Sequence, residues 1–485
     1  MKKNVVRVLQ LFVVTYLLVN FVPRLVIEGM FPDGLTYAAI GRNMAQGNGS
    51  FWQPFFASSF WLPYEGASYE FWGHPTLAMW FLSLLYRIFG DAWWVEKLYC
   101  FLIWTAAIAS VRWLWRGFQS DAEIRKLDVL ALLLWYATPI VLWSFPYAML
   151  DNTMSVFCFL AVASGIKWAS LNGENALKWL VLMVCCLVAA VLTKGPIGLF
   201  PLAVPFFYCL THERARWGDG FLKSAGATLF FMAIMACFWY YPPAQNFFKH
   251  YFQEQIMGSI NAPNEGSGER FDLVLIVRKE LIPLAIVAIL FLIFTRLKII
   301  KTNENTQKIW FWSLVWLSAT LPMLISRKLS ANYVVPSMPF AAFAVAQWLS
   351  PTLTTALASV REEAKWVMGL RRFCQVVLVG LMIYCGTIAG KTQAGREQDL
   401  IEDMKLLSQY IPPHAQIRVC EPMMKDFCIH AYFQRYHFWQ PTFDDTKAQY
   451  AIVRTGCAPQ FASDTLKNYT PVAIPTTEYQ LFIKK

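Results

Sequence analysis

Two aspartates stand beside long apolar runs, where each could act in acid–base chemistry. Asp33 follows the first apolar run, within the letters FPDG, and Asp151 follows a later one, within MLDN. A carboxylate held at a membrane boundary can take a proton from a hydroxyl nucleophile, and a well-placed base contributes roughly 10² to 10⁴ in rate. Aspartate also caps helices and forms turns, so on spacing alone both interpretations of each residue stay open.

Cationic side chains stand at other ends of apolar runs, where they could bind an anionic phosphate. These residues are His74, Lys194, Arg327 and Lys328. A phosphate about 4 Å from a cation near a protein surface gains up to ~4 kcal/mol before desolvation costs are subtracted. Taken singly, each cation could instead reach towards lipid headgroups.

Aromatic residues near the same ends could line a groove for an isoprenoid chain or stack on a sugar. The candidates are Tyr37, Trp239, Tyr240 and Tyr251. The alternative is the aromatic belt that membrane proteins place at the lipid–water interface.

The composition indicates what kind of scaffold positions these residues. Of the 485 residues, 57% are hydrophobic and only 15% are charged, which excludes a disordered, fibrous or small disulfide-framework protein. A multi-spanning membrane protein remains. The net charge of +11 is therefore interpreted as Lys and Arg distributed between the two sides of a membrane. No nucleic-acid partner is expected.

Eleven apolar segments are predicted to span the membrane. They lie near residues 5–26, 93–111, 128–147, 152–170, 178–193, 196–211, 221–240, 281–296, 309–326, 331–349 and 373–390. The segment 74–89 is apolar but short, and we interpret it as lying in the interface. Most Lys and Arg residues then lie in segments on the same side of the membrane as the N-terminus. Because cytoplasmic segments are enriched in Lys and Arg, this places the N-terminus in the cytoplasm and the C-terminus outside. If 74–89 spans instead, the cluster 296–308 falls on the opposite side.

The chain is predicted to form two domains. Residues 1–390 form the transmembrane domain, with a large outer loop at about 27–92 that begins with an amphipathic helix on the membrane surface, carrying Tyr37, Ile40 and Met44. Residues 391–485 have a soluble composition and are predicted to form a small α/β domain. Its predicted elements are a helix with Leu400, Ile401, Met404 and Leu407 and strands at 416–420, 449–454 and 479–483.

The cysteines and histidines set limits on disulfides and metals. Eight cysteines lie in apolar runs, and Cys420, Cys428 and Cys457 lie in the polar C-terminal part, which allows at most one disulfide. The histidines are scattered and no pair of cysteines has zinc spacing, so we expect no protein-built metal site.

Taken in order, the motifs resemble the GT-C glycosyltransferases of the protein O-mannosyltransferase and lipid A aminoarabinose transferase type. The resemblance covers residues 1 to about 350. It rests on PDGLTYA at 32–38, HPTL at 74–77, LYRIFG at 85–90, MLD at 149–151, LTKGPI at 192–197 and SRKL at 326–329. Many relatives have an acidic residue where this chain has Gly34, and Lys-Pro-Pro where it has HPT at 74–76.

The resemblance implies a GT-C fold with about 11 to 13 transmembrane helices and a glycosyltransferase activity of the inverting kind. The enzyme would take a sugar from a polyprenyl monophosphate, in a bacterium undecaprenyl phosphate, and pass it to a protein, lipid A or other glycan acceptor at the outer face of the inner membrane. Asp33 matches the family's catalytic aspartate and Asp151 its second aspartate. Lys194 and Arg327, with Lys328 and His74 beside them, would bind the donor phosphate. The family is often indifferent to metal, and a divalent cation bound through the substrate phosphate stays open.

The main alternative is a flippase or transporter of polyprenyl-linked sugars. Such proteins tend to show internal repeats and ionisable groups near the bilayer midplane. No repeat is visible, and within the predicted spans only Glu96 and Lys97 stand out as charged, near an outer end. The sequence identifies neither the sugar nor the acceptor.

Overall fold

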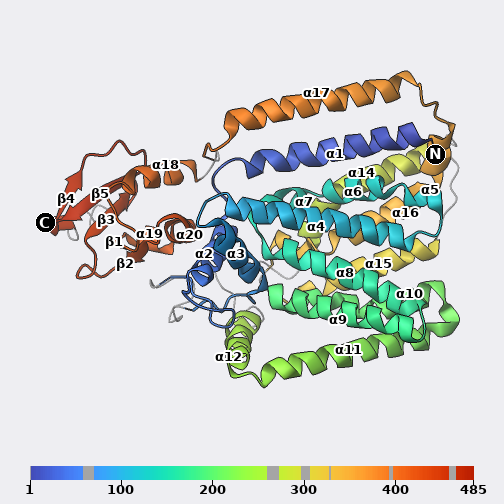
Figure 1. The fold of residues 1–485 in the computed structure, drawn as a ribbon, viewed down its shortest axis with the longest axis horizontal. Helices are drawn as coiled ribbons and strands as arrows, with labels where there is room; N and C mark the ends of the chain where they lie inside the picture. Colours follow the sequence, from blue (N-terminus) through green and yellow to red (C-terminus); the bar gives the residue numbers. More distant parts are fainter. Residues whose placement is uncertain are drawn as a thin grey trace.

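The structure is a computed structural model, and it describes residues 2–57, 70–258, 272–296, 306–326, 329–392, 397–457 and 466–485. Long helices pack side by side in one bundle, and a small α/β domain is attached at one end of it (Figure 1). The predicted fold class, an all-helical membrane protein with a small C-terminal α/β domain, is confirmed.

The long bundle helices have the following bounds: α1 (Lys3–Leu25), α4 (Val95–Phe118), α8 (Leu150–Ser170), α9 (Glu174–Lys194), α11 (Trp217–Trp239), α14 (Asp272–Arg296), α15 (Thr306–Thr320), α16 (Met338–Ser359) and α17 (Lys365–Ile388). Shorter elements connect them: α5 (Ala122–Arg125), α6 (Asp128–Tyr136), α7 (Pro139–Ser144), η1 (Phe145–Tyr147), η2 (Pro196–Ala203), α10 (Val204–His212), η3 (Arg214–Arg216), η5 (Leu321–Ile325) and η6 (Ala331–Val334).

All eleven predicted spans coincide with helical segments, but not all are simple spans. Within the described ranges, seven helices are long and apolar enough to cross a membrane, or eight if α6 and the segment Pro139–Tyr147, bent by 78°, form one span. The bend follows from Pro139, because a proline disfavours helical geometry in the residue before it. The segment Pro196–His212 is shorter and begins with 3₁₀ turns that contain Pro196 and Pro201.

The bundle is built around α8. This helix packs against α4, α9 and α10, and 72% of its most apolar window is buried, whereas α11 and α17 are each only 11% buried over theirs. A helix that is apolar all round and left exposed at the rim of a bundle is suited to face lipid. The central position of α8 means that a charge in its first turn is surrounded by protein.

Further helical elements lie at the end of the bundle that carries the C-terminal domain (Figure 1). These are α2 (Pro32–Ala45), α3 (Leu77–Phe89), α12 (Pro242–His250) and the π-helical turn η4 (Tyr251–Met257). The N-terminus and α5 lie at the opposite end (Figure 1). With 13 residues α3 is about 20 Å long, too short for a hydrocarbon core of about 30 Å, which favours the interfacial interpretation of 74–89.

The prediction that α2 lies on the membrane surface is wrong, because α2 is buried on nearly every side. It packs against α3 and against α20 (Phe427–Tyr432) of the C-terminal domain, and even Arg42 and Asn43 are buried. Small residues of α2 permit this close packing. A Cβ atom on Gly41 would lie 2.8 Å from the Cβ atom of Leu82.

The C-terminal domain contains a five-stranded sheet in the order β2-β1-β3-β5-β4. Its strands are β1 (Gln416–Arg418), β2 (Gln440–Thr442), β3 (Tyr450–Arg454), β4 (Tyr469–Val472) and β5 (Tyr479–Lys484), and its helical elements are α18 (Gln398–Leu407), α19 (Glu421–Lys425), α20, η7 (Phe433–His437) and η8 (Leu466–Asn468). β1 pairs in parallel with β2 and β3, and β5 pairs antiparallel with β3 and β4. The predicted helix and all three predicted strands are present.

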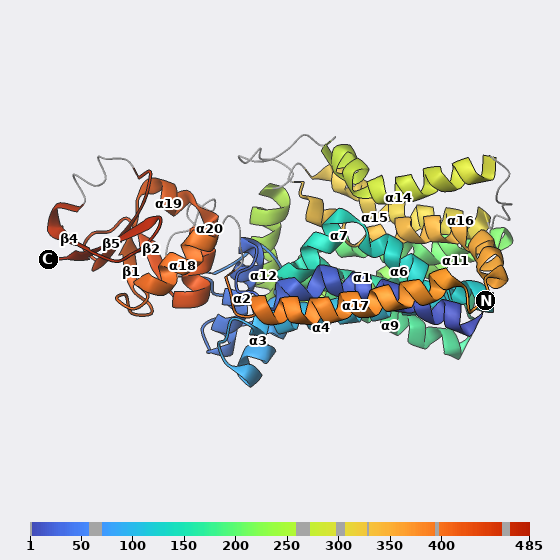
Figure 2. The same cartoon turned by 90° about the horizontal axis from the view of Figure 1, so that it is seen from above.

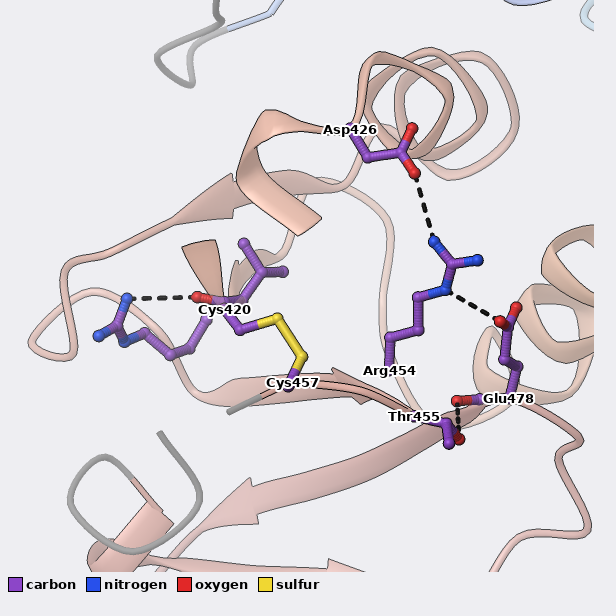
Figure 3. Close-up of a disulfide and its surroundings, with 8 residues drawn as sticks. Cys420, Asp426, Arg454, Thr455, Cys457 and Glu478 are labelled. Atoms are coloured by element: carbon purple, nitrogen blue, oxygen red, sulfur yellow. Dashed lines mark hydrogen bonds and ion pairs between the residues drawn. A yellow bond between two sulfur atoms is a disulfide. The ribbon is translucent and has the colours of Figure 1, made fainter. Parts of the chain in front are cut away.

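One disulfide, between Cys420 and Cys457, joins the loop after β1 to the end of β3 (Figure 3). Beside it, Arg454 bridges Asp426 and Glu478, with nitrogen–oxygen distances of 3.4 and 3.0 Å. Cys428 lies outside the disulfide. The sequence limit of one disulfide among these three cysteines is therefore met.

Candidate functional site

The centre of the candidate site is an ion pair between Asp151 and Lys194. Asp151 lies in the first turn of α8 and Lys194 is the last residue of α9. The Nζ atom of Lys194 lies 2.5 Å from Oδ2 of Asp151, and the two side chains are only 4% and 0% exposed. Removal of either partner would leave a buried charge, so the pair is expected to be kept only where it is needed.

Local hydrogen bonds hold the start of α8 in place. The side-chain amide of Asn152 donates to the carbonyl of Ser144, at 2.8 Å, and the hydroxyl of Tyr99 lies 2.6 Å from that of Thr153. Just before the helix, Ala148 adopts the left-handed region with φ of 49°, which is unusual for a residue with a side chain. This turn aims the first turn of α8, and with it Asp151, towards α9.

A cavity of about 420 Å³ opens beside the ion pair. Its polar lining residues are His74, Lys194, Tyr251, Gln255, Ser318, Ser326 and Tyr333, and its apolar ones are Pro196, Ile197, Leu199, Phe200, Ile256, Ala319, Pro322, Met323 and Ile325. An apolar cavity with a few convergent polar groups is the usual form of a small-molecule site.

Tyr251 and Tyr333 define the polar part of the cavity around Lys194. The Nζ atom of Lys194 lies 4.4 Å from the ring centroid of Tyr333, and the hydroxyl of Tyr251 donates to the carbonyl of Lys194 at 3.2 Å. Burial raises the pKa of Tyr251, so its hydroxyl stays protonated. The next residue, Gly195, has φ of +94°, and a Cβ atom there would lie 2.1 Å from the Tyr251 oxygen. A glycine is therefore required at this turn.

Asp33 lies in the first turn of α2 and is not among the residues that line this cavity. Its side chain is half-buried. Tyr37, one turn further on, has its ring centroid 6.1 Å from that of His74, which lines the cavity. Tyr37 thus connects the Asp33 helix to the cavity.

Gly34 explains how Asp33 comes close to the start of α8. A Cβ atom on Gly34 would lie 2.0 Å from the carbonyl oxygen of Tyr147, four residues before Asp151. The acidic residue that many relatives of the expected family have at this position would not fit. The start of α2 therefore packs against the turn that precedes α8.

The structure brings together only some of the predicted site residues. His74, Lys194 and Tyr251 line the cavity, Asp151 pairs with Lys194, and Tyr37 contacts His74 in the cavity wall. Asp33 lies outside the wall, one turn before Tyr37 in α2. Trp239 and Tyr240 lie at the end of α11, 46% and 87% exposed, and are absent from the cavity wall. Arg327 and Lys328 lie outside the described residues.

Several lining residues were not selected from the sequence. Gln255 and Ile256 lie in η4, and Pro322 and Met323 lie in η5. The sequence indicates them only by their position near the ends of apolar segments. Across the described ranges, no group of three or more His, Cys, Asp or Glu is placed to hold a metal ion.

No protein-family model matches the sequence, and no curated protein sequence does. Solved structures do match. ArnT from Cupriavidus metallidurans bound to undecaprenyl phosphate is 15% identical, with a TM-score of 0.67 over 97% of each chain. The apo state of the same protein gives 15% identity and a TM-score of 0.63 over 97% of each chain. The apo oligosaccharyltransferase of Archaeoglobus fulgidus gives 11% identity and a TM-score of 0.50, over 92% of this chain and 65% of that one.

The chain therefore has the GT-C fold. This confirms the fold that the sequence resemblance implied. Because the matched ArnT and this chain cover each other almost end to end, the fold includes the small C-terminal domain as well as the helical bundle.

Proposed function

We propose that the protein is an integral-membrane glycosyltransferase that transfers a sugar from a polyprenyl monophosphate donor to an acceptor hydroxyl or phosphate. The observation that carries this proposal is the cavity next to Asp151 and Lys194, which joins a buried cation to an apolar wall. A polyprenyl phosphate has the same two parts, an anion and a long apolar chain. The similarity in fold to an ArnT crystallised with undecaprenyl phosphate supports this donor class.

Lys194 is the proposed binding group for the donor phosphate. An ammonium group has three N–H donors. One is directed to Asp151, which leaves others for a phosphate in the cavity. Asp151 would hold the ammonium group in place, and Lys194 would stabilise the charge that develops on the leaving phosphate oxygen. His74 lines the same cavity and would add a second contact. We keep Arg327 and Lys328 as proposed phosphate ligands on sequence grounds.

Asp33 is the proposed general base. It would take the proton from the acceptor while the acceptor oxygen attacks the anomeric carbon, and the bond from that carbon to the donor phosphate would break on the opposite face. This displacement inverts the configuration of the sugar. Asp33 lies outside the cavity wall, one turn before Tyr37 in α2, and its neighbour Gly34 contacts the turn before α8, which suits a group that meets the acceptor rather than the donor phosphate.

The isoprenoid chain would lie along the apolar wall of the cavity. Ile197, Leu199 and Phe200 come within six residues after Lys194, and Pro322 and Met323 line the same cavity. Trp239 and Tyr240, exposed at the end of α11, would lie at the membrane interface. Among the described residues no group of three or more His, Cys, Asp or Glu is placed to hold a metal ion, so a divalent cation would bind through the donor phosphate.

We place the catalytic part in residues 1–390, and the domain 391–485 on the outer face of a bacterial inner membrane, with the N-terminus in the cytoplasm. Two observations support this orientation. The N-terminus and the C-terminal domain lie at opposite ends of the bundle (Figure 1). The Cys420–Cys457 disulfide lies in the C-terminal domain, and disulfides persist in oxidising compartments such as the periplasm.

The test is release of polyprenyl phosphate from a panel of undecaprenyl phosphate sugars, by purified protein supplied with membrane extract as acceptor source. Consumption of one donor, lost in Lys194→Met, would support the proposal and name the sugar. Arg216→Met is a control, since Arg216 lies after the C-terminal end of α10, where it forms ion pairs with Glu213 and Asp219. If no donor is consumed but labelled donor crosses a vesicle membrane containing the protein, the flippase alternative is supported instead.

A further inference from the structure

The C-terminal domain contacts the backbone just ahead of the proposed catalytic helix. The hydroxyl of Tyr432, in α20, donates to the carbonyl of Met30 at 2.9 Å and accepts from the Met30 N–H at 3.3 Å. Both residues are buried, with 1% and 2% exposure. Met30 precedes Asp33 by three residues. One hydroxyl therefore satisfies both backbone groups of the residue that leads into α2.

The far end of α2 is also attached to the C-terminal domain. The guanidinium of Arg42 is fully buried and donates to the carbonyls of Gln434 and Arg435 in η7, at 2.8 and 2.9 Å. The same group lies 3.4 Å from the ring centroid of Phe438. α2 is thus held near both of its ends by contacts with α20 and η7. α20 lies beside α2 in two perpendicular views (Figures 1 and 2).

The segment that holds α2 is itself fixed to the bundle. The buried guanidinium of Arg435 forms ion pairs with Asp91 and Glu96, at 2.7 and 2.9 Å, and Glu96 also accepts from the hydroxyl of Tyr86 at 2.8 Å. Glu96 lies in the first turn of α4 and Asp91 lies just before it. These contacts fix η7 to the start of α4 in the helical bundle.

On its other side, the start of α2 meets the turn before α8. Gly34 lies so close to the carbonyl oxygen of Tyr147 that no Cβ atom fits between them. Asp33 therefore stands at a point fixed from two directions, by Tyr432 through Met30 and by Tyr147 through Gly34. The first of these contacts comes from residues 402 positions away in the chain.

We propose that Tyr432 is a positioning residue for Asp33, so that the C-terminal domain is a working part of the active site. This inference rests on the proposed function, since it assigns the purpose of the contact to the Asp33 carboxylate. Loss of the Tyr432 hydroxyl would release the backbone at Met30 and let the start of α2 shift. Displacement of a reacting group by about 1 Å costs on the order of 100-fold in rate.

The test uses Tyr432→Phe in the full chain, with Tyr469→Phe as a matched control. Tyr469 is also buried, and its hydroxyl also donates to a backbone carbonyl, that of Ala448, but this bond lies within the C-terminal domain. For Tyr432→Phe we expect kcat to fall by about 10- to 100-fold while the donor KM changes little. Backbone amides around 28–36 should exchange with deuterium faster than in the wild type. Tyr469→Phe should change neither kcat nor this exchange.

The outcomes separate the inference from the proposed function. If Tyr432→Phe keeps the wild-type kcat, or if Tyr469→Phe loses kcat to the same extent, the positioning role is overturned. If the wild-type protein transfers no sugar, the proposed function fails, and amide exchange still decides the structural part. If the amides at 28–36 then exchange faster in Tyr432→Phe but not in Tyr469→Phe, the Tyr432 hydroxyl holds this segment in place. Unchanged exchange in Tyr432→Phe would contradict this.

Discussion

The ammonium group of Lys194 lies 2.5 Å from the carboxylate of Asp151, although 43 residues separate the two in the chain. The pair joins the end of one central helix to the start of another, and the cavity opens beside it. A buried ion pair contributes little net stability compared with apolar side chains of the same size. Its presence at the cavity is therefore better explained by function than by folding.

The ion pair makes a distinct prediction for single and double variants. Asp151→Asn or Lys194→Met alone leaves one buried charge without its partner, and each is expected to destabilise the fold by about 3–5 kcal/mol. The double variant removes both charges, so it should lose much less than the sum of the two single losses. Thermal unfolding of the purified proteins measures this, and strictly additive losses would contradict the pairing. All three variants should lack transfer activity.

Gly34 is predicted to be irreplaceable. In an ordinary helix, Gly to Ala stabilises by up to about 1 kcal/mol, but at Gly34 the new methyl group would collide with the Tyr147 carbonyl. We expect Gly34→Ala to lose activity by about 100-fold or more, because α2 must move and take Asp33 with it. Gly218→Ala in α11, where nothing lies within 4 Å of the new atom, is the control and should keep full activity. Equal activity of the two variants would argue against the close contact.

The disulfide is predicted to stabilise the C-terminal domain. Cys420 and Cys457 are 37 residues apart, and closure of a loop of that length stabilises by about 4 kcal/mol in the chain-entropy treatment. Replacement of both cysteines by Ala should lower the unfolding temperature of this domain, and Cys428→Ala, outside the disulfide, should not. A wild-type protein whose Cys420 and Cys457 both react with a thiol reagent before reduction would contradict the bond.

The stability of the C-terminal domain is also predicted to fall in mild acid. Burial lowers the pKa of His437 to about 4, while an exposed His has a pKa near 6.5. Between these values the unfolded chain binds a proton and the folded chain does not. The contribution of His437 is therefore complete above pH 6.5 and is lost as the pH falls towards 4, up to about 3 kcal/mol. In His437→Phe, which keeps the contact with Trp439, unfolding followed against pH should be flatter over this range. An unchanged slope would show that His437 is not the group responsible.

Local patterns predicted the elements of this fold better than the contacts between them. The strands β1, β3 and β5 follow from apolar and β-branched residues, whereas β2 and β4 contain Pro441 and Pro471, which argue against a strand. Both are edge strands, where a missing N–H is tolerated. α2 was placed on the membrane because one apolar face was visible, while its small residues gave no sign of packing.

The candidate site was predicted in part, for a similar reason. Asp151, Lys194 and His74 stand at ends of apolar runs, a signal that a single segment can carry. The pairing of Lys194 with Asp151, and the contact of Tyr432 with Met30, join distant segments. The apolar periodicity of a single segment does not predict such pairs, because they depend on how helices and domains pack. The exposed aromatics Trp239 and Tyr240 were selected by residue type alone, and they lie at the end of α11, apart from the residues that line the cavity.

The central claim is that Asp33 is the base in a transfer from a polyprenyl phosphate sugar. The most direct measurement compares the wild type with Asp33→Asn for release of undecaprenyl phosphate from a consumed donor. The substitution keeps the size of the side chain and removes its ability to take a proton. We expect kcat to fall by about 10²- to 10⁴-fold with donor binding retained. Wild-type turnover by Asp33→Asn would contradict it, and would leave Asp33 as a helix-start residue.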